Sequence, residues 1–496
     1  MTYLNLESDW TKFISPGAVF TSEIVSDANA IDPVGLQNTE EKRDSETVQS
    51  IASNETEECE KQGKWSELPS LPLKKIYSFL RRKDQINMSL VCRSWSEGYG
   101  SPSVWKTFRF SLQESQVLMD SCPVLKFVEK YSSMFRHLKI NGLCSENKHL
   151  VKNWCRHFVE LLQNLTRNTE LISVEFKYFS YCLTHIDTPT YNYICRSIAD
   201  FLASQHHLKL VEFYLCPFEY QESVNLLRII IENSRESLEH LKLRDFVSDE
   251  NEDSNAAKKL PMLADLPSLK TLETDYSFIF ENMVAGQSTA IQAVKNFKTL
   301  VLSKLILYNY STYSEIEDFT GLTSTNWRFM KTLYPNLQIE LILTVDSAAR
   351  RAFEFFILPN MPISHLRYSN CDFNVGTEIV VLFDHLLACK TNEHLVYLKI
   401  DWEEPTQHLS STINPFLHAC KKLKCFELFM YNTTSGVDVL LESWLENRPE
   451  TLEKVIIDIL YLHNGNDIPD WNNINDYVSL LKLTGLNIKI KYKGKI

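Results

Sequence analysis

Cysteine and histidine are the residues of this chain that could bind a metal ion or act as nucleophiles. The 496 residues include 12 cysteines and 13 histidines, but there is no C-x-x-C pair and no Cys/His group with the spacing of a zinc site. His206 and His207 lie between Cys195 and Cys216, where they fit a loop between a helix and a strand. We therefore expect no metal and no cofactor, and reduced thiols that act as small apolar side chains.

The sequence also lacks the short motifs of the common enzyme classes. It contains no G-x-G-x-x-G, G-x-x-x-x-G-K, G-x-S-x-G or H-E-x-x-H segment. Nothing in the sequence marks one cysteine as the thiolate that a cysteine-based ligase would need. We predict that the chain is not an enzyme and that a partner supplies any chemistry.

Residues 65–110 are predicted to form a small helical unit that has more apolar surface than its own core can bury. Leu73, Ile76, Tyr77 and Leu80 recur at helical spacing, and Asp84 can cap a second helix. Apolar residues lie on two sides of that second helix, which indicates burial on two sides. A unit of about 45 residues is marginally stable alone, so it must dock on the rest of the chain, on a partner or on both.

This stretch resembles the F-box family. The family pattern is matched in order by Leu68-Pro69, Ile76, Leu80, Asp84, Val91-Cys92, Trp95, Pro102 and Trp105. The resemblance implies that the stretch binds a Skp-type adaptor, which hangs from a cullin scaffold. The implied adaptor-binding residues, some of them serving as internal core, are Leu68, Pro69, Ile76, Leu80, Val91, Trp95 and Trp105. The alternative is a three-helix fragment of another α domain.

From about residue 135 the chain repeats an apolar pattern of the form L-x-x-L-x-L. Copies begin at Phe135, Leu171, Leu208, Leu238, Leu269, Phe297, Ile363, Leu395, Leu423 and Leu452. Alternation without the full spacing occurs at 337–343, and a final edge strand is expected at 488–492. Helical patterns lie between the copies at 151–168, 223–237, 324–333, 348–358, 376–390, 438–447 and 476–483. Strands and helices that repeat every 26 to 40 residues or so predict a solenoid.

The repeating unit resembles leucine-rich repeats, although the Asn or Cys that usually follows the core is mostly absent. The resemblance implies an α/β fold in which a small helical F-box precedes a horseshoe of short parallel strands and helices. The layout is similar to the divergent F-box group that includes the F-box-only proteins numbered thirty-three and thirty-nine. The alternative is an ordinary α/β domain. The expected organisation is an acidic, mostly disordered tail at 1–63, the F-box at 64–110, a linker at 111–134 and the repeats at 135–496.

Two surfaces of the repeats are candidates for binding a protein substrate. One is the outward face of the strands, where charged residues alternate with aromatic ones, and the other is a rim of long loops that follow the strands. The rim loops are expected at 179–190, 247–258, 275–286, 308–322, 402–411 and 462–475, with an acidic run at 249–253. The candidate residues are Tyr178, Phe179, Tyr214, Arg244, Tyr308, Tyr310, Tyr397 and Trp402.

Net charge and hydropathy narrow the class of partner. The net charge of −12 disfavours nucleic acid as the main ligand, because binding to phosphates needs a basic surface. No signal peptide and no apolar run of 18 residues is present, so a cytoplasmic or nuclear protein without a membrane partner is expected. The predicted function is that of a substrate-recognition subunit of a Skp–cullin–F-box ubiquitin ligase. The alternatives are a non-degradative scaffold or inhibitor, and a receptor with a small molecule in the repeat cup.

Overall fold

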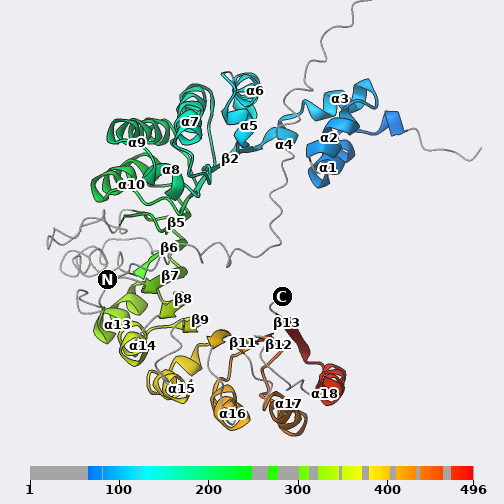
Figure 1. Cartoon of the computed structure of the whole chain (residues 1–496), viewed down its shortest axis with the longest axis vertical. Helices are drawn as coiled ribbons and strands as arrows, with labels where there is room; N and C mark the ends of the chain where they lie inside the picture. Colours follow the sequence, from blue (N-terminus) through cyan, green and yellow to red (C-terminus); the bar gives the residue numbers. More distant parts are fainter. Residues whose placement is uncertain are drawn as a thin grey trace, which may run out of the picture. The chain divides into compact units, whose positions relative to one another are not determined.

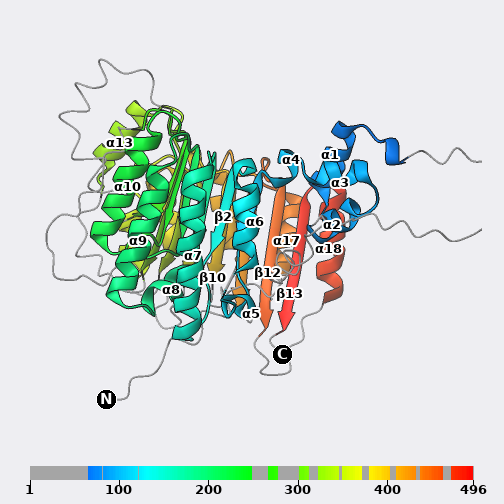
Figure 2. The ribbon, with the colours of Figure 1, turned by 90° about the horizontal axis from the view of Figure 1, so that it is seen from above.

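The computed structural model describes residues 65–80, 82–120, 122–248, 266–276, 301–311, 322–345, 349–370, 379–402, 409–431, 436–461 and 471–494. These residues belong to two compact units, the first ending at Gln205 and the second beginning at His206. Figures 1 and 2 show the same chain from two directions, and each unit contains strands that alternate with helices. The expected N-terminal tail and the acidic run at 249–253 lie outside the described residues.

The first unit opens with a cluster of short helices. They are η3 (Trp65–Glu67), α1 (Ser70–Phe79), α2 (Arg82–Ser89), α3 (Arg93–Tyr99) and α4 (Pro102–Trp105). The predicted apolar stripe of the first helix forms the core, because Leu73, Tyr77 and Met88 are buried there. Gly98 of α3 permits close approach of α1, since an added Cβ would lie 2.7 Å from Cδ2 of Leu73.

The rest of the first unit is a parallel sheet whose strands are separated by helices. Its elements are β1 (Thr107–Phe110), α5 (Glu114–Val117), α6 (Pro123–Tyr131), η4 (Ser132–Met134), β2 (His137–Asn141), α7 (Lys148–Asn168), β3 (Ser173–Lys177), α8 (Ser180–Thr184) and α9 (Thr188–Ala203). Strand β1 pairs with β2 and β2 with β3, all in parallel. Parallel neighbours need a crossover between them, and the helices provide it.

The sheet of this unit therefore begins earlier than the sequence predicts. Phe108 and Phe110 are buried on β1, and α5 and α6 cross from β1 to β2. The stretch predicted as a linker, 111–134, is thus part of the first strand–helix repeat. Apolar and polar residues alternate over only four positions in β1, which is too few to distinguish a strand from the helical pattern that precedes it.

The second unit continues the alternation of strand and helix. Its strands are β4 (Leu210–Tyr214), β5 (His240–Arg244), β6 (Thr271–Asp275), β7 (Lys304–Ser311), β8 (Gln338–Val345), β9 (Ile363–Asn370), β10 (Tyr397–Trp402), β11 (Cys425–Tyr431), β12 (Lys454–Tyr461) and β13 (Asn487–Gly494). Its helices are α10 (Tyr220–Ser234), α13 (Ser324–Leu333), α14 (Ala349–Phe356), α15 (Ile379–Ala388), η8 (Thr391–Glu393), α16 (Leu409–Ala419), α17 (Val437–Glu446) and α18 (Trp471–Leu483).

Each strand of the second unit pairs in parallel with the next one along the chain, from β4 to β13. Figure 1 shows the helices along one face of these strands. Side chains alternate between that buried face and the opposite face, as in β10, where Leu398 and Ile400 are buried and Tyr397 and Lys399 are half-buried. The predicted α/β class, with a helical F-box region before alternating parallel strands and helices, is confirmed.

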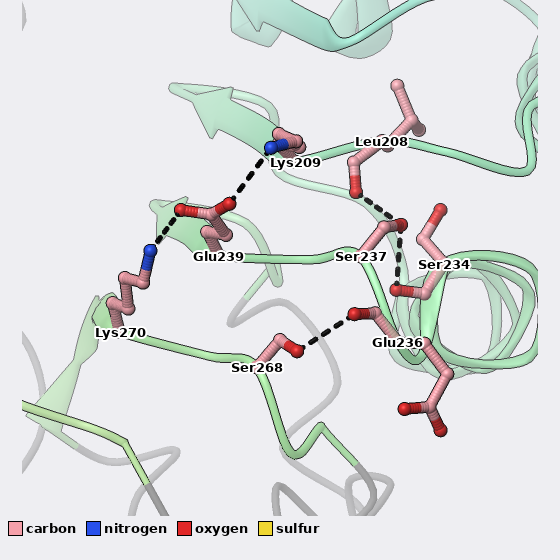
Figure 3. Close-up of polar contacts among 8 residues, drawn as sticks. All are labelled: Leu208, Lys209, Ser234, Glu236, Ser237, Glu239, Ser268 and Lys270. Carbon is pink, nitrogen blue, oxygen red and sulfur yellow. Dashed lines mark hydrogen bonds and ion pairs between the residues drawn. The ribbon is translucent and has the colours of Figure 1, made fainter.

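Polar contacts at the start of the strands repeat from one strand to the next (Figure 3). The carbonyl oxygen of Lys209 accepts N–H donors from both Glu239 and His240, and that of Glu239 accepts them from Lys270 and Thr271. The Glu239 carboxylate also lies 3.2 Å from Nζ of Lys209 and 2.5 Å from Nζ of Lys270. These contacts fix the register of β4, β5 and β6.

Serine hydroxyls close the turns that lead into the same strands. Ser237 donates to the carbonyl oxygen of Leu208 at 2.9 Å, and Ser268 donates to that of Glu236 at 2.8 Å (Figure 3). Each hydroxyl therefore links a turn to the preceding repeat. It also gives a hydrogen-bond donor to a carbonyl oxygen that lies before the strand and outside the strand pairing.

Most predicted copies fall on strands, but the copy predicted to begin at Phe297 is displaced. Leu305 was predicted as the fourth position of that copy, whereas β7 begins at Lys304 and Leu305 pairs with Leu272. Leu302, Leu305 and Leu307 thus take the first three core positions. Three helices, α8, α9 and α16, are also absent from the predicted set. Helix α8 lies within the loop predicted at 179–190, α9 begins within the same loop, and α16 begins within the loop predicted at 402–411.

Candidate protein-binding surfaces

Hydrogen bonds from side chains to backbone carbonyl groups link the helices of residues 65–105. The hydroxyl of Tyr77 donates to the carbonyl oxygen of Trp95 at 2.7 Å, and Nε1 of Trp95 donates to that of Trp65 at 2.9 Å. Nε2 of Gln85 donates to the carbonyl oxygens of Tyr77 and Leu80, at 2.8 and 3.2 Å, which satisfies the end of α1. Burial and then the charge of Cys92 raise the pKa of Tyr77 to about 12, so this phenol is neutral at physiological pH.

The predicted adaptor-binding residues divide between this core and the surface. Ile76, Leu80 and Trp95 are half-buried and pack against the core. Leu68 is half-buried, while Pro69 is exposed at the start of α1. Val91 is 63% exposed.

Trp105 is one of the predicted residues that serve as internal core. Its side chain is 4% exposed, and Nε1 donates to the carbonyl oxygen of Tyr99 at 2.8 Å. Its ring centroid lies 4.7 Å from that of Phe127 and 5.5 Å from that of Tyr131, both on α6. Trp105 thus joins the helical cluster to the first strand–helix repeat, and its predicted contact with an adaptor is not supported.

Large apolar side chains that were not predicted for the site are exposed on η3, on α1 and on the turn between α2 and α3. Trp65 is 65% exposed, Leu71 76%, Phe79 76% and Leu90 74%. With Val91 they make up five of the fifteen exposed large apolar residues found among the described residues. The signal was available: Leu71 and Phe79 lie outside the core stripe of α1, so the core cannot bury them. We call these five residues the apolar surface.

Comparison with known families identifies the helices that carry the apolar surface. Residues 65–97 match the F-box domain. The match covers η3, α1 and α2 and most of α3, and ends before α4. F-box domains bind Skp-type adaptors in cullin–RING ligases, and F-box proteins are generally non-catalytic.

The outward strand face of the second unit brings three predicted residues together. The guanidinium carbon of Arg244 on β5 lies 4.8 Å from the ring centroid of Tyr214 on β4 and 4.6 Å from that of Tyr308 on β7. The hydroxyl of Tyr308 donates to Oε1 of Glu273 at 2.6 Å. Tyr308 was predicted on a loop, but it lies within β7, which is why it reaches this cluster. We call Tyr214, Arg244 and Tyr308 the Tyr–Arg–Tyr cluster.

Charged side chains border this cluster. Nζ of Lys242 lies 3.4 Å from Oε2 of Glu212 and 3.9 Å from Oε2 of Glu273. Cation–π contact and opposite charges together order long side chains that would otherwise be mobile on an open face. The strand face is therefore a structured surface with both charges and aromatic rings.

A second group of this kind surrounds Tyr397 on β10. Its ring lies 5.7 Å from the guanidinium carbon of Arg367 and stacks on His365 at 5.7 Å. Burial and then the charge of Glu427 raise the pKa of Tyr397, and burial lowers the pKa of His365. Both groups are therefore neutral near pH 7 and can pack as rings.

The remaining candidates do not form one site. Tyr178 is half-buried with a φ of 63°, whereas Phe179 is fully buried and Trp402 is 4% exposed. Phe179 and Trp402 thus belong to the core and offer no surface for a substrate. The side chain of Tyr310 and most of the predicted rim loops lie outside the described residues.

The described residues contain no group of three His, Cys, Asp or Glu side chains placed to hold a metal ion. Within the same residues no helix is long and apolar enough to cross a membrane. A cavity of about 790 Å³ lies between α16 and α17, lined by residues such as Ser410, Asn414 and Ser443. None of its lining residues comes from a strand, so it lends no support to a small-molecule site on the strand face.

Proposed function

We propose that this chain is the substrate-recognition subunit of a Skp–cullin–F-box ubiquitin ligase. The observation that carries the proposal is the apolar surface: five large side chains are exposed within 65–91, inside the segment that matches the F-box domain. Their exposure to water is unfavourable, and covering one such side chain contributes about 1.5–3 kcal/mol. An adaptor that covers them would gain this energy without disturbing the core of Leu73, Tyr77 and Met88.

The strand face of the second unit would hold the protein substrate. Tyr214 and Arg244 of the Tyr–Arg–Tyr cluster are half-buried and supply a ring and a cation, while Tyr308, 8% exposed, holds Arg244 in place from below. Tyrosine and arginine are among the side chains that most often dominate the energy of protein interfaces. The adaptor and cullin would then bring the ubiquitin-charged enzyme near this substrate, so the chain would act by proximity and not by its own chemistry.

The proposal is tested by capture of a purified Skp-type adaptor and cullin on the immobilised full chain. Leu71→Ser with Phe79→Ser should reduce capture by at least about tenfold, because two exposed apolar contacts are removed while the core is untouched. The matched control is Val439→Ser, a side chain 52% exposed on α17, which should capture normally.

Two outcomes would contradict the proposal. If the wild-type chain captures no adaptor, the F-box segment serves only inside this chain. If the adaptor and cullin bind but a complete ligase transfers no ubiquitin to proteins held by the strand face, the chain is a non-degradative scaffold or inhibitor.

A further inference from the structure

The last helix and strand of the second unit form a surface that the proposed function does not use. Helix α18 turns into β13 through Gly485, whose φ of 88° favours glycine. The N–H of Leu486 donates to the carbonyl oxygen of Leu481, and that of Gly485 to the carbonyl oxygen of Lys482, a pair of bonds that defines a Schellman motif. This short, hydrogen-bonded turn fixes the position of β13 next to α18.

Strand β13 has an open edge. It pairs with β12, and with no other strand in the part of the chain that the structure describes (Figure 1). The N–H of Asn487 donates to the carbonyl oxygen of Glu453, toward β12. Backbone groups alternate in direction along a strand, so the N–H and C=O groups of Ile488 and Ile490 point to the open edge. Such an edge is a template for a further strand.

Side chains on the two faces of β13 differ in character. Lys489 and Lys491 are exposed on one face, in register with Ile456 and Asp458 of β12. Nζ of Lys491 lies 3.6 Å from Oδ1 of Asp458. On the other face, which packs toward α18, Ile488 is buried. Ile490, which follows it on that face, is half-buried.

The helix beside β13 adds exposed apolar surface. Leu483 is 84% exposed, the highest value among the exposed large apolar residues of the described chain, and Leu480 is 47% exposed. Three residues apart, they are neighbours on the helix and lie on a different side from buried Leu481. The two leucines interrupt an exposed side of α18 that otherwise carries polar residues such as Asp476 and Ser479, so apolar contact is available beside β13.

We propose that the β13 edge binds an extended protein segment in which acidic and apolar residues alternate. The backbone of the segment would pair with Ile488 and Ile490, its acidic side chains would lie beside Lys489 and Lys491, and its apolar side chains beside Ile490. Residues 481–496 contain five lysines and no acidic residue in a chain of net charge −12, which makes this end selective for an acidic partner. Pairing of two copies through the same edge would bring lysines together and is unfavourable.

The test uses a fluorescent eight-residue peptide in which glutamate and valine alternate, titrated into the full chain and followed by anisotropy. Saturable binding is expected, weakened about tenfold or more by Lys489→Glu with Lys491→Glu, because attraction becomes repulsion at two cross-strand positions. Lys421→Glu with Lys422→Glu, an exposed pair that gives the same change in net charge, should bind as the wild type does. Hydrogen exchange at the Ile490 amide should slow when the peptide binds.

Control peptides separate strand pairing from general charge attraction. A lysine–valine peptide should not bind. N-methylation of the alternate amides of the glutamate–valine peptide that would hydrogen-bond to β13 should abolish binding. The proposal is overturned by any of four results: no binding up to about 1 mM, equal binding to the Lys489/Lys491 variant, equal binding of the methylated peptides, or dimerisation of the free chain through β13.

Discussion

Replacement of Trp105 by alanine distinguishes a structural role for this residue from a role in adaptor binding. The side chain is 4% exposed and contacts the rings of Tyr99, Phe127 and Tyr131. Removal of a buried tryptophan costs about 3–5 kcal/mol, because apolar contacts are lost and a cavity remains. The carbonyl oxygen of Tyr99 also loses its donor.

Hydrogen exchange of the amides between residues 65 and 135 measures this loss locally. A change of about 3–5 kcal/mol should lower the protection of amides in α1, α3 and α6 by roughly two to four orders of magnitude. Trp105→Phe retains a ring but loses the N–H donor, and should cost about 1–3 kcal/mol. At a temperature where the Ala variant is folded, its affinity for a Skp-type adaptor should equal that of the wild type.

The opposite pattern would refute this reasoning. If Trp105→Ala leaves hydrogen exchange unchanged but weakens adaptor binding, then Trp105 is a contact residue and not a joint between the helical cluster and the first repeat. Unchanged exchange together with unchanged adaptor binding would mean that the ring contacts of Trp105 contribute little.

Three further predictions concern stability. Gly142→Ala should lower stability by about 1–3 kcal/mol or more in urea unfolding, because the new Cβ would lie 2.2 Å from the carbonyl oxygen of Tyr178; Gly100→Ala, with its nearest atom at 3.5 Å, is the tolerated control. Burial, and then the charge of Arg156, lower the pKa of His157, so the folded state disfavours protonation of this side chain. The contribution of neutral His157 to the free energy of unfolding is fully present above about pH 6.5 and is lost as the pH falls through the folded pKa. The difference between the thermal midpoints at pH 7.5 and pH 5.5 should therefore be smaller in His157→Gln than in the wild type. Arg244→Ala should cost about 1–2 kcal/mol in urea unfolding through the loss of two cation–π contacts, and an unchanged midpoint would contradict the Tyr–Arg–Tyr cluster.

Long periodic segments of this chain could be predicted from the sequence, and short or interrupted ones could not. The helix predicted at 324–333 has the bounds of α13, and the copy beginning at Leu395 falls on β10. Strand β1 has four residues, too few for alternation to stand out. At β7 two leucine series overlap, Leu300 to Leu305 and Leu302 to Leu307, and only strand pairing decides between them.

The binding surfaces show a similar division. The F-box pattern located the helices that match the F-box domain, but motif positions such as Trp105 serve the core and pack against the first strand–helix repeat. Exposed Leu71 and Phe79, which we propose for adaptor binding, could not be singled out beforehand because a pattern does not separate residues that fill a core from residues left outside it. The meeting of Tyr214, Arg244 and Tyr308 depends on strand register over β4 to β7, which spacing along the chain does not encode.

Hydroxyl-radical footprinting of the full chain with and without a Skp-type adaptor tests the central claim most directly, because it reports the exposure of individual side chains. The account predicts that labelling of Trp65, Leu71, Phe79 and Leu90 falls when the adaptor binds, while buried Trp105 stays unlabelled in both states and Val439 on α17 keeps its labelling. Unchanged labelling of the apolar surface in a chain that has bound adaptor would contradict the claim that this surface is the adaptor site.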